Sequence, residues 1–491
     1  MPIYSVPPDA LWSSSNVCVR DGFLQTRPGL TQRSATVMDG RPTGIYNAPQ
    51  LAEGAFQTDT FENPSFQVTA GLPGSLLMVG TTTEIYGQFG TTLTNITGGT
   101  LTAGDTQVAR FTAISLAGVI YVIHANGKDA PIQWDATTAA FGAMVGAPAT
   151  WTDVTNIAEH IIGIVPPFNI SWGDSQAINS WPAANTRVLS DTPDVLRAIA
   201  SLGVRTGVVY KSNSLWDVVV TGSETESEFF RFEMRGEVEG PSGPAAVVNA
   251  NGAHVYMTDT GRVGYYNGSR HFWVADGIWP LIQADMDPTA GGLTFGAYDP
   301  LHRAVVFVYQ RAADAAGICK GWAMVMLPNP AEGYNDFIAF HGESEVALSA
   351  GGSLRFNEFK GLFATSTAGA QRLYTWDGAD DAGTAISGHL QTGLVPSPGL
   401  EFFAVDAYET LALRGTGYGT LTVKPVSSYI LDTEGGTVGS GKTLDLATST
   451  VLGGAKGGDI RGRFFGLRYE FTTPVTLKWL GARLAAKLRK G

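Results

Sequence analysis

The segment Gly436–Thr443 has the residue types and spacing of a phosphate-binding loop, G-x-x-x-x-G-K-T. A working loop of this kind follows a strand and opens a helix, because backbone N–H groups and the helix N-terminus must converge on the phosphate. The residues that follow it, LDLATSTVLGG, are rich in β-branched residues and glycine and predict a poor helix. We therefore interpret the segment as a Gly-rich loop and keep nucleotide hydrolysis there as a minor hypothesis.

The triplet Asp259-Thr260-Gly261 matches the sequence of an aspartic-protease site. Such a site needs two carboxylates that share a proton, and the chain has no second triplet of this kind. The seven histidines offer no H-x-x-x-H zinc pair, because no two of them lie within four residues. A G-x-S-x-G nucleophile elbow is also missing. The sequence therefore predicts a protein that is not an enzyme and uses no metal or cofactor.

The same triplet is explained more simply as the tight turn of a β-hairpin. Two β-prone runs, His254–Thr258 and Arg262–Tyr266, flank it, and Asn267-Gly268 supplies the next turn. The apolar core of this hairpin, His254–Met257, is one of seven such runs, each followed by turn residues and a second β-prone run. The others are Ser75–Met78, Val119–Ile123, Ile161–Val165, Gly207–Tyr210, Ala304–Tyr309 and Gly361–Ala364.

Successive runs lie roughly 40 to 55 residues apart, which is the period of a four-stranded propeller blade. We predict an all-β fold: a β-propeller of four-stranded blades with an additional C-terminal β domain. A β-sandwich would also contain many short strands, but the number of repeats and the scarcity of helical patterns favour the propeller, and the spacing leaves the number of blades open. The predicted domains are an N-terminal segment at 1–40, the propeller at 41–380 and the C-terminal β domain with a basic tail at 381–491.

One segment has a helical pattern. Pro193–Leu202 follows a capping residue, Asp191 or Thr192, and precedes Gly203, which is typical of a helix end. Trp172, Trp181 and Trp273 could stack on a sugar, but tryptophan more often packs between blades. The S-x-D-x-G-x-T-W box of sialidase propellers is missing, which weakens a glycosidase interpretation.

The composition is acidic overall, with a formal net charge of −12 over 491 residues. An acidic protein is a poor candidate for gripping nucleic-acid phosphate, because that affinity comes mainly from Lys and Arg. Cys18 and Cys319 are far apart in the sequence and predict no disulfide framework, consistent with maturation in a reducing cytoplasm. The N-terminus lacks the features of a signal peptide, and no apolar run is long enough for a membrane span.

The C-terminal stretch is basic, in contrast to the rest of the chain. Lys456–Lys490 holds nine Lys or Arg residues against two acidic residues, a local charge of +7. Such a stretch could contact DNA, an acidic protein surface or solvent, and its position as a tail favours protein contact. We predict contact with an adaptor protein or a neighbouring subunit through Arg461, Arg463, Arg468, Lys478, Arg483, Lys487, Arg489 and Lys490.

Three stretches resemble tail nozzle proteins of short-tailed bacteriophages, also called tail hub or packaged-DNA stabilisation proteins. Gly22–Thr31, GFLQTRPGLT, resembles the family's G-[YF]-L-x-x-x-P-G-[LI]-T segment, and its matching residues include Gly22, Phe23, Leu24, Arg27, Pro28 and Gly29. Phe465–Tyr469 with Thr473–Lys478 is similar to the C-terminal segment of the family. Phe229–Phe232, with Gly236, Gly240 and Ser242, resembles its central stretch.

The resemblance implies a structural virion protein whose protomers form a ring, expected to be a hexamer, in the phage tail. The ring would be assembled in the host cytoplasm, lie below the adaptor and portal, and close the DNA-filled head. Tail fibres or spikes would attach outside, and double-stranded DNA would pass through the lumen without sequence-specific binding. Gly87–Thr106 and Gly435–Gly458 depart from the family pattern. The alternative is a glycan-binding or glycan-degrading propeller of a phage tail.

Overall fold

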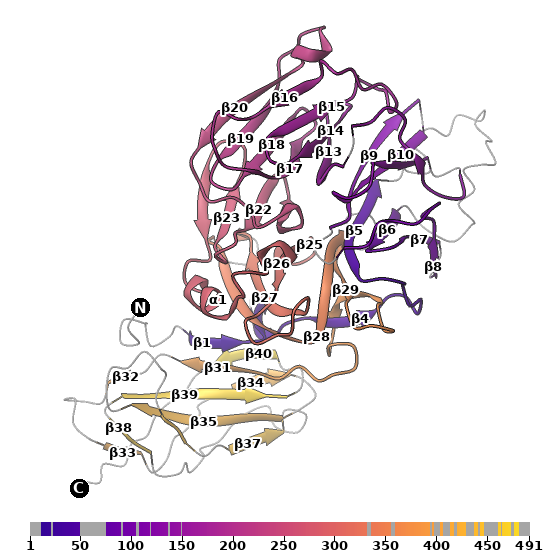
Figure 1. Cartoon of the computed structure of the whole chain (residues 1–491). Helices are drawn as coiled ribbons and strands as arrows, with labels where there is room; N and C mark the ends of the chain where they lie inside the picture. Colours follow the sequence, from indigo (N-terminus) through magenta and orange to yellow (C-terminus); the bar gives the residue numbers. More distant parts are fainter. Residues whose placement is uncertain are drawn as a thin grey trace.

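The computed structural model has two parts: a ring of radial β-sheets and a smaller group of strands, drawn below the ring in Figure 1. Its description covers residues 11–20, 23–49, 75–89, 92–104, 108–117, 119–135, 138–148, 150–330, 335–354, 359–392, 395–396, 403–405, 413–416, 420–428, 437–439, 442–445, 460–462, 464–472 and 476–480. Within these residues the regular secondary structure is mostly β-strand, with little helix, which confirms the predicted fold class.

The first four blades are separate antiparallel sheets of four consecutive strands. Their strands are β5 (Pro42–Pro49), β6 (Ser75–Thr81), β7 (Ile85–Phe89) and β8 (Thr92–Asn95); β9 (Arg110–Leu116), β10 (Val119–Ala125), β11 (Ile132–Trp134) and β12 (Gly142–Ala143); β13 (Asp153–Ile157), β14 (His160–Val165), β15 (Asn169–Trp172) and β16 (Thr186–Val188); and β17 (Leu196–Gly203), β18 (Thr206–Lys211), β19 (Leu215–Val220) and β20 (Phe230–Gly236).

Three more blades complete the ring in the described residues. The fifth contains β21 (Val247–Ala250), β22 (Ala253–Met257), β23 (Val263–Tyr266) and β24 (His271–Val274). The sixth and seventh share the long strand β28 (Ile338–Leu354). They also contain β25 (Phe295–Asp299), β26 (Ala304–Tyr309), β27 (Cys319–Met326), β29 (Lys360–Thr365), β30 (Leu373–Gly378) and β4 (Gly29–Gln32).

Strand β28 is shared because its two halves pair with different neighbours. Residues 338–343 pair with β27 as the outer strand of the sixth blade, whereas residues 348–354 pair with β29 as the inner strand of the seventh. Successive innermost strands contact one another, and β28 contacts β5, which closes the ring. The outer strand of the last blade is β4, from the N-terminal end of the chain, so the ring is fastened by strands from distant parts of the sequence.

The seven predicted apolar runs all lie in the second strand of a blade: β6, β10, β14, β18, β22, β26 and β29. This strand has a neighbour on each edge and another blade on each face, so its side chains are buried on both sides. β26, for example, is buried at all six positions. The repeat in the sequence is therefore the repeat of the most buried strand, and it gives one signal per blade.

The hairpin around Asp259 matches its prediction. β22 and β23 pair in antiparallel register, and Gly261 and Gly268 have positive φ angles of 78° and 87°. Glycine reaches such angles without the steric cost that a Cβ would impose. The triplet is thus a turn, and its carboxylate forms an ion pair with Arg197 at 3.2 Å.

The predicted helix at Pro193–Leu202 is wrong, because Leu196–Gly203 is β17, the inner strand of the fourth blade. Leu196, Ala198 and Ile199 are buried there against neighbouring blades, and burial and strand pairing outweigh a modest helix preference. The α-helix in the described residues is α1 (Trp279–Asp285), and the short 3-10 helices are η3 (Glu226–Glu228), η4 (Pro244–Ala246) and η5 (Gly291–Leu293).

The smaller part combines both ends of the chain (Figure 1). One sheet contains β1 (Leu11–Ser15), β31 (Gly388–Thr392), β32 (Val395–Pro396), β35 (Thr420–Ser428), β36 (Thr437–Val438), β37 (Lys442–Asp445) and β39 (Phe464–Phe471). A second contains β2 (Val17–Arg20), β3 (Phe23–Thr26), β34 (Leu413–Thr416) and β40 (Thr476–Leu480), and β33 (Phe403–Val405) pairs with β38 (Ile460–Gly462).

The domain bounds at residues 41 and 381 stay predictions, but strand pairing places the N-terminal segment more closely. β1 to β3 belong to the sheets of the C-terminal domain, whereas β4 belongs to the propeller. Residues 11–32 therefore connect both parts of the molecule.

Candidate functional site at the junction of the two domains

The junction between the domains is built around a buried charge, Arg27, in the link between β3 and β4. Arg27 is 1% exposed and Asp381 is 0% exposed. Nη1 and Nη2 of Arg27 donate to the two carboxylate oxygens of Asp381 at 2.9 and 2.5 Å. A forked pair of this geometry is the strongest arrangement that arginine makes with a carboxylate.

Aromatic rings enclose the guanidinium. Its carbon lies 5.0 Å from the ring centroid of Trp376 in β30 and 5.5 Å from that of Trp322 in β27. These two indoles are within 6.4 Å of each other, at 70°. Because the guanidinium is buried, the attraction between the cation and the rings is stronger than it would be at the surface.

Asn16, between β1 and β2, links this site to the smaller domain. Its Oδ1 accepts hydrogen bonds from Arg27 Nε at 3.1 Å and from Trp322 Nε1 at 3.2 Å. Its Nδ2 donates to the backbone oxygen of Ser387 at 2.6 Å. One amide side chain therefore bonds to the N-terminal link, to the sixth blade and to the start of the C-terminal domain.

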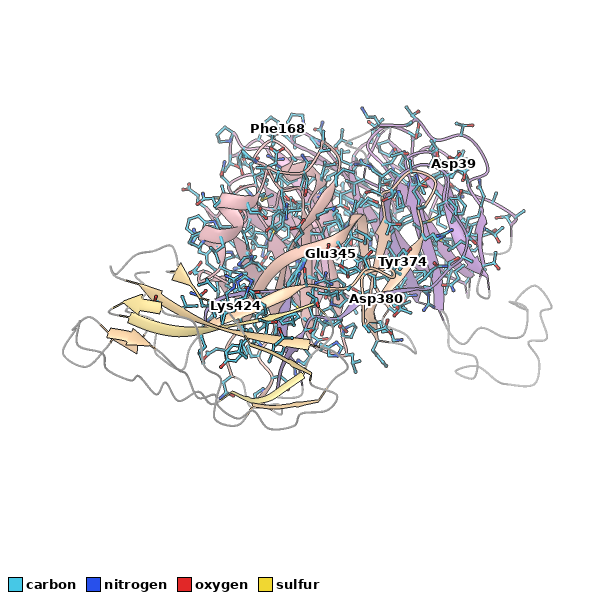
Figure 2. The ribbon with its side chains drawn as sticks, turned by 90° about the horizontal axis from the view of Figure 1, so that it is seen from below. Asp39, Phe168, Glu345, Tyr374, Asp380 and Lys424 are labelled. Carbon is cyan, nitrogen blue, oxygen red and sulfur yellow. The ribbon has the colours of Figure 1, made fainter. Side chains whose placement is uncertain are left out.

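The crossing point of β28 between two blades is held by the same ion pair. Asp381 accepts from the backbone N–H of Glu345 at 2.9 Å and from Ser344 Oγ at 3.4 Å. The backbone oxygen of Glu343 accepts from Arg27 Nη2 at 3.3 Å. Figure 2 shows Glu345 and Asp380 on the side of the propeller that carries the C-terminal strands, with Phe168 at the opposite edge.

A shared apolar core supports these polar contacts. Leu390, Tyr469 and Phe471 of the C-terminal sheet are in one buried cluster with Trp322 and Met324 of the sixth blade. The cluster includes residues of both domains, so the junction has one continuous core. Burying apolar surface there stabilises the junction by about 25 cal/mol per Å². The two domains are thus fastened by packing as well as by charge.

The two terminal landmarks of the sequence meet at this junction. β3 pairs with β40, with Leu24 opposite Leu477 and Gln25 opposite Thr476. β39, which holds the C-terminal Phe465–Tyr469 landmark, lies in the neighbouring sheet and pairs with β31. Segments roughly 450 residues apart in the sequence, which together carry the family resemblance, are therefore adjacent in space.

The six residues of the N-terminal landmark have different places. Gly22 lies outside the described residues, and Phe23 and Leu24 are in β3. Arg27, Pro28 and Gly29 are buried. A Cβ on Gly29 would lie 2.1 Å from the backbone oxygen of Asp380, so this glycine allows β4 to approach the start of the C-terminal domain.

The eight basic residues proposed as contacts are only partly described. Arg461 is in β38 and Lys478 is in β40, whereas Arg463, Arg483, Lys487, Arg489 and Lys490 lie outside the described residues. Arg468 Nε pairs with Glu470 Oε1 at 3.0 Å, and Glu470 also pairs with Lys424 at 2.6 Å. Arg468 is thus already engaged within its own sheet.

The phosphate-loop-like segment lacks the required framework in its described residues. Lys442–Asp445 is strand β37, paired with β35, at the place where a phosphate-binding loop would open a helix. Thr437–Val438 is also a strand, β36. Two short strands, β36 and β37, therefore flank the Gly-rich loop, and the described residues after it form a strand and not the start of a helix.

The three tryptophans have structural contacts. Trp172 is 2% exposed and packs between the third and fourth blades, and Trp181 lies with its ring centroid 4.9 Å from that of Trp151. Trp273 has one face covered by the Arg262 guanidinium at 4.2 Å. In the described residues, no group of three potential metal ligands is arranged to hold an ion, and no helix could span a membrane.

Several histidines are buried with structural contacts, as expected. His160 Nδ1 lies 2.7 Å from the oxygen of Ala158, and its Nε2 lies 2.7 Å from Glu226 of η3. His254 lies 2.9 Å from the Tyr210 hydroxyl. His124 is 2% exposed, with its ring 5.0 Å from Phe111 and 6.4 Å from Phe141.

Because His124 is buried, we expect the stability of the fold to decrease at acidic pH. Burial lowers the pKa of His124 from 6.5 to about 3, so the unfolded chain binds this proton more readily than the folded chain. The stabilising effect of a neutral His124 is complete above pH 6.5 and declines as the pH falls toward 3, by about 1.4 kcal/mol per pH unit. We expect H124F to reduce this decline, as measured by urea unfolding between pH 7 and 4. A slope equal to that of the wild type would contradict the assignment.

Most partners at the junction were missed by sequence reasoning. Asp381 lies in GADDAGT, which has the composition of a linker, and Asn16 lies in a Ser-rich loop-like stretch. Arg27 was singled out, but its carboxylate is 354 residues away. A single sequence contains no signal that pairs two such residues.

The fold and the junction define a class: a seven-bladed β-propeller, in the described residues, with a β domain fastened to it by N-terminal strands.

No family model and no curated protein matches the chain. Among solved structures, it is similar to the β-propeller domain of Myceliophteria thermophila Cps50 (Swd1), at 10% identity and TM-score 0.41, covering 71% of this chain and 99% of that one. BamB from Moraxella catarrhalis is 12% identical in sequence, with a TM-score of 0.38, and the match covers 71% of this chain and 99% of that one. The computationally designed protein Ika8 is 9% identical in sequence, with a TM-score of 0.40, and the match covers 75% of this chain and 98% of that one.

Proposed function

We propose that this chain is a structural subunit of a phage tail, forming a nozzle or hub ring below the adaptor and portal. The observation that supports this proposal is the meeting of the two terminal landmarks in one sheet, β3 against β40. The residues that carry the family resemblance thus include the fastening between propeller and C-terminal domain. A subunit under pressure from packaged DNA needs its domains held rigidly, and a buried ion pair with a shared core provides this.

The proposed ring, expected to be a hexamer, closes the DNA-filled head and forms the channel for DNA ejection. The net charge of −12 suits such a channel, because an acidic wall repels the DNA backbone and allows passage without sequence-specific binding. Tail fibres or spikes are the proposed outer partners, and the virion tail is the proposed location.

The ring is tested with the full-length chain alone and mixed with its adaptor. We expect rings in negative-stain micrographs and the chain in purified virions by mass spectrometry. A chain that stays monomeric beside its adaptor and is missing from virions would end the proposal. The alternative of a glycan-binding or glycan-degrading propeller is tested by binding and sugar release on a panel of host polysaccharides.

The basic tail provides a more specific test. Reversing Arg483, Lys487, Arg489 and Lys490 to glutamate should weaken adaptor binding or ring formation at least about tenfold, with a smaller effect at high salt because exposed charges are screened. The matched control reverses four exposed basic residues of the propeller: Lys128, Arg187, Arg205 and Arg270. Equal losses in both variants would show that net charge, and not the tail, is responsible.

A further inference from the structure

The innermost strands of the propeller enclose a cavity of about 350 Å³, lined by residues from all seven blades. Side chains of one inner strand bond to the backbone of the next around this cavity. Thr43 Oγ1 accepts from the N–H of Ala109 at 3.2 Å, and Thr155 Oγ1 accepts from the N–H of Ser201 at 3.1 Å. These bonds satisfy part of the exposed strand edges, and polar groups make up the larger part of the exposed cavity wall.

Arg110, at the start of β9, is the charged residue among those that line the cavity. Its Nε donates to Asp153 Oδ1 at 2.7 Å, and its side chain is 24% exposed whereas that of Asp153 is 0% exposed. The same carboxylate accepts the backbone N–H of Val154 at 3.0 Å and of Ile199 at 2.9 Å. Both oxygens of Asp153 are thus occupied by fixed donors on the strand side.

The two terminal nitrogens of Arg110, Nη1 and Nη2, differ from its Nε in their hydrogen bonding. Within the part of the chain that the structure describes, Asp153 is the acceptor of the guanidinium, and it engages Nε alone. Nη1 and Nη2 have no hydrogen bond or ion pair within these described residues, and Arg110 is one of the residues that line the cavity. A guanidinium fork matches the two oxygens of a carboxylate or phosphate, and a cavity of about 350 Å³ is within the range of small-molecule sites.

We propose that the central cavity binds a small oxyanion, a phosphate or a carboxylate, on the terminal nitrogens of Arg110. The hydroxyl-bearing residues Thr112 and Ser353 also line the cavity. Asp153 holds the guanidinium in place through Nε, so that Nη1 and Nη2 can donate to the ligand. This site is independent of the proposed ring, which depends on the junction and the tail.

The test uses the full-length protein with inorganic phosphate and, separately, acetate, at constant ionic strength set with potassium chloride. Binding to the folded state alone raises the melting temperature in a saturable way. We expect saturation by at least one of the two anions, and the comparison between them distinguishes a phosphate site from a carboxylate site. Absence of saturable stabilisation by either anion would overturn the proposal, and this result needs only the wild-type chain.

Variants then locate the site. R110Q should weaken binding at least about tenfold, and R110K should weaken it less, because lysine keeps the charge without the fork. R187Q is the matched control, since Arg187 is an exposed cation whose side chain is 51% accessible, and it should bind as the wild type does. Unchanged binding by folded R110Q would overturn the proposal. If R110Q does not fold, equal affinity of R110K and the wild type would overturn it.

Discussion

Replacing Arg27 with methionine is expected to lower the free energy of unfolding by about 3 to 5 kcal/mol. The variant keeps an apolar stem between Trp322 and Trp376 but leaves the Asp381 carboxylate, which is fully buried, without its counter-charge. A buried, unpaired carboxylate carries the full cost of its lost hydration. Urea unfolding at pH 7, followed by circular dichroism, measures the change.

The control for Arg27 is R187M, because Arg187 and Asp191 form an exposed pair with side chains 51% and 53% accessible. Exposed pairs contribute about 0 to 1 kcal/mol, so this variant should unfold close to the wild type. The double variant R27M/D381N should recover part of the loss, because neither charge is then buried alone. Equal stability of R27M and R187M would contradict the role that we assign to the junction.

The second large effect is expected for Lys211 in β18, whose side chain is 0% exposed. Its Nζ donates to the backbone oxygens of Leu189 and Thr192, both at 2.9 Å, and lies 3.2 Å from Asp194 Oδ1. K211M should lower the free energy of unfolding by about 3 to 5 kcal/mol, because it removes this donor from the oxygens of Leu189 and Thr192 and leaves the Asp194 carboxylate without its counter-charge. These contacts hold the connection from the third blade to the fourth.

The comparison for K211M is K128M, since Lys128 is exposed. Thermal unfolding of both variants at pH 7 should show a clear decrease for K211M and little change for K128M. Limited proteolysis should also cut the connection at residues 189–195 faster in K211M, since its anchor is lost. A K211M variant as stable and as resistant as K128M would show that the buried ammonium is not needed.

The repeating architecture could be predicted from the sequence because it is a local property. Each second strand, such as Ala304–Tyr309, is surrounded on both faces, so burial requires a continuous apolar run. The turns around Gly261 and Gly268 were equally clear, because positive φ angles restrict the choice of residue. The candidate site was only half predicted: Arg27 was identified, but not its environment.

The sequence by itself determined the all-β class, the blade repeat and the presence of a further β region near the C-terminus. The tertiary structure decided the rest, because ring closure, the shared strand β28 and the pairing of β3 with β40 join residues that no local pattern connects. It also made Leu196–Gly203 a strand, since the inner position of a blade requires one. Above all, it placed Arg27 opposite Asp381, where two domains exclude water and a charge pair becomes strong.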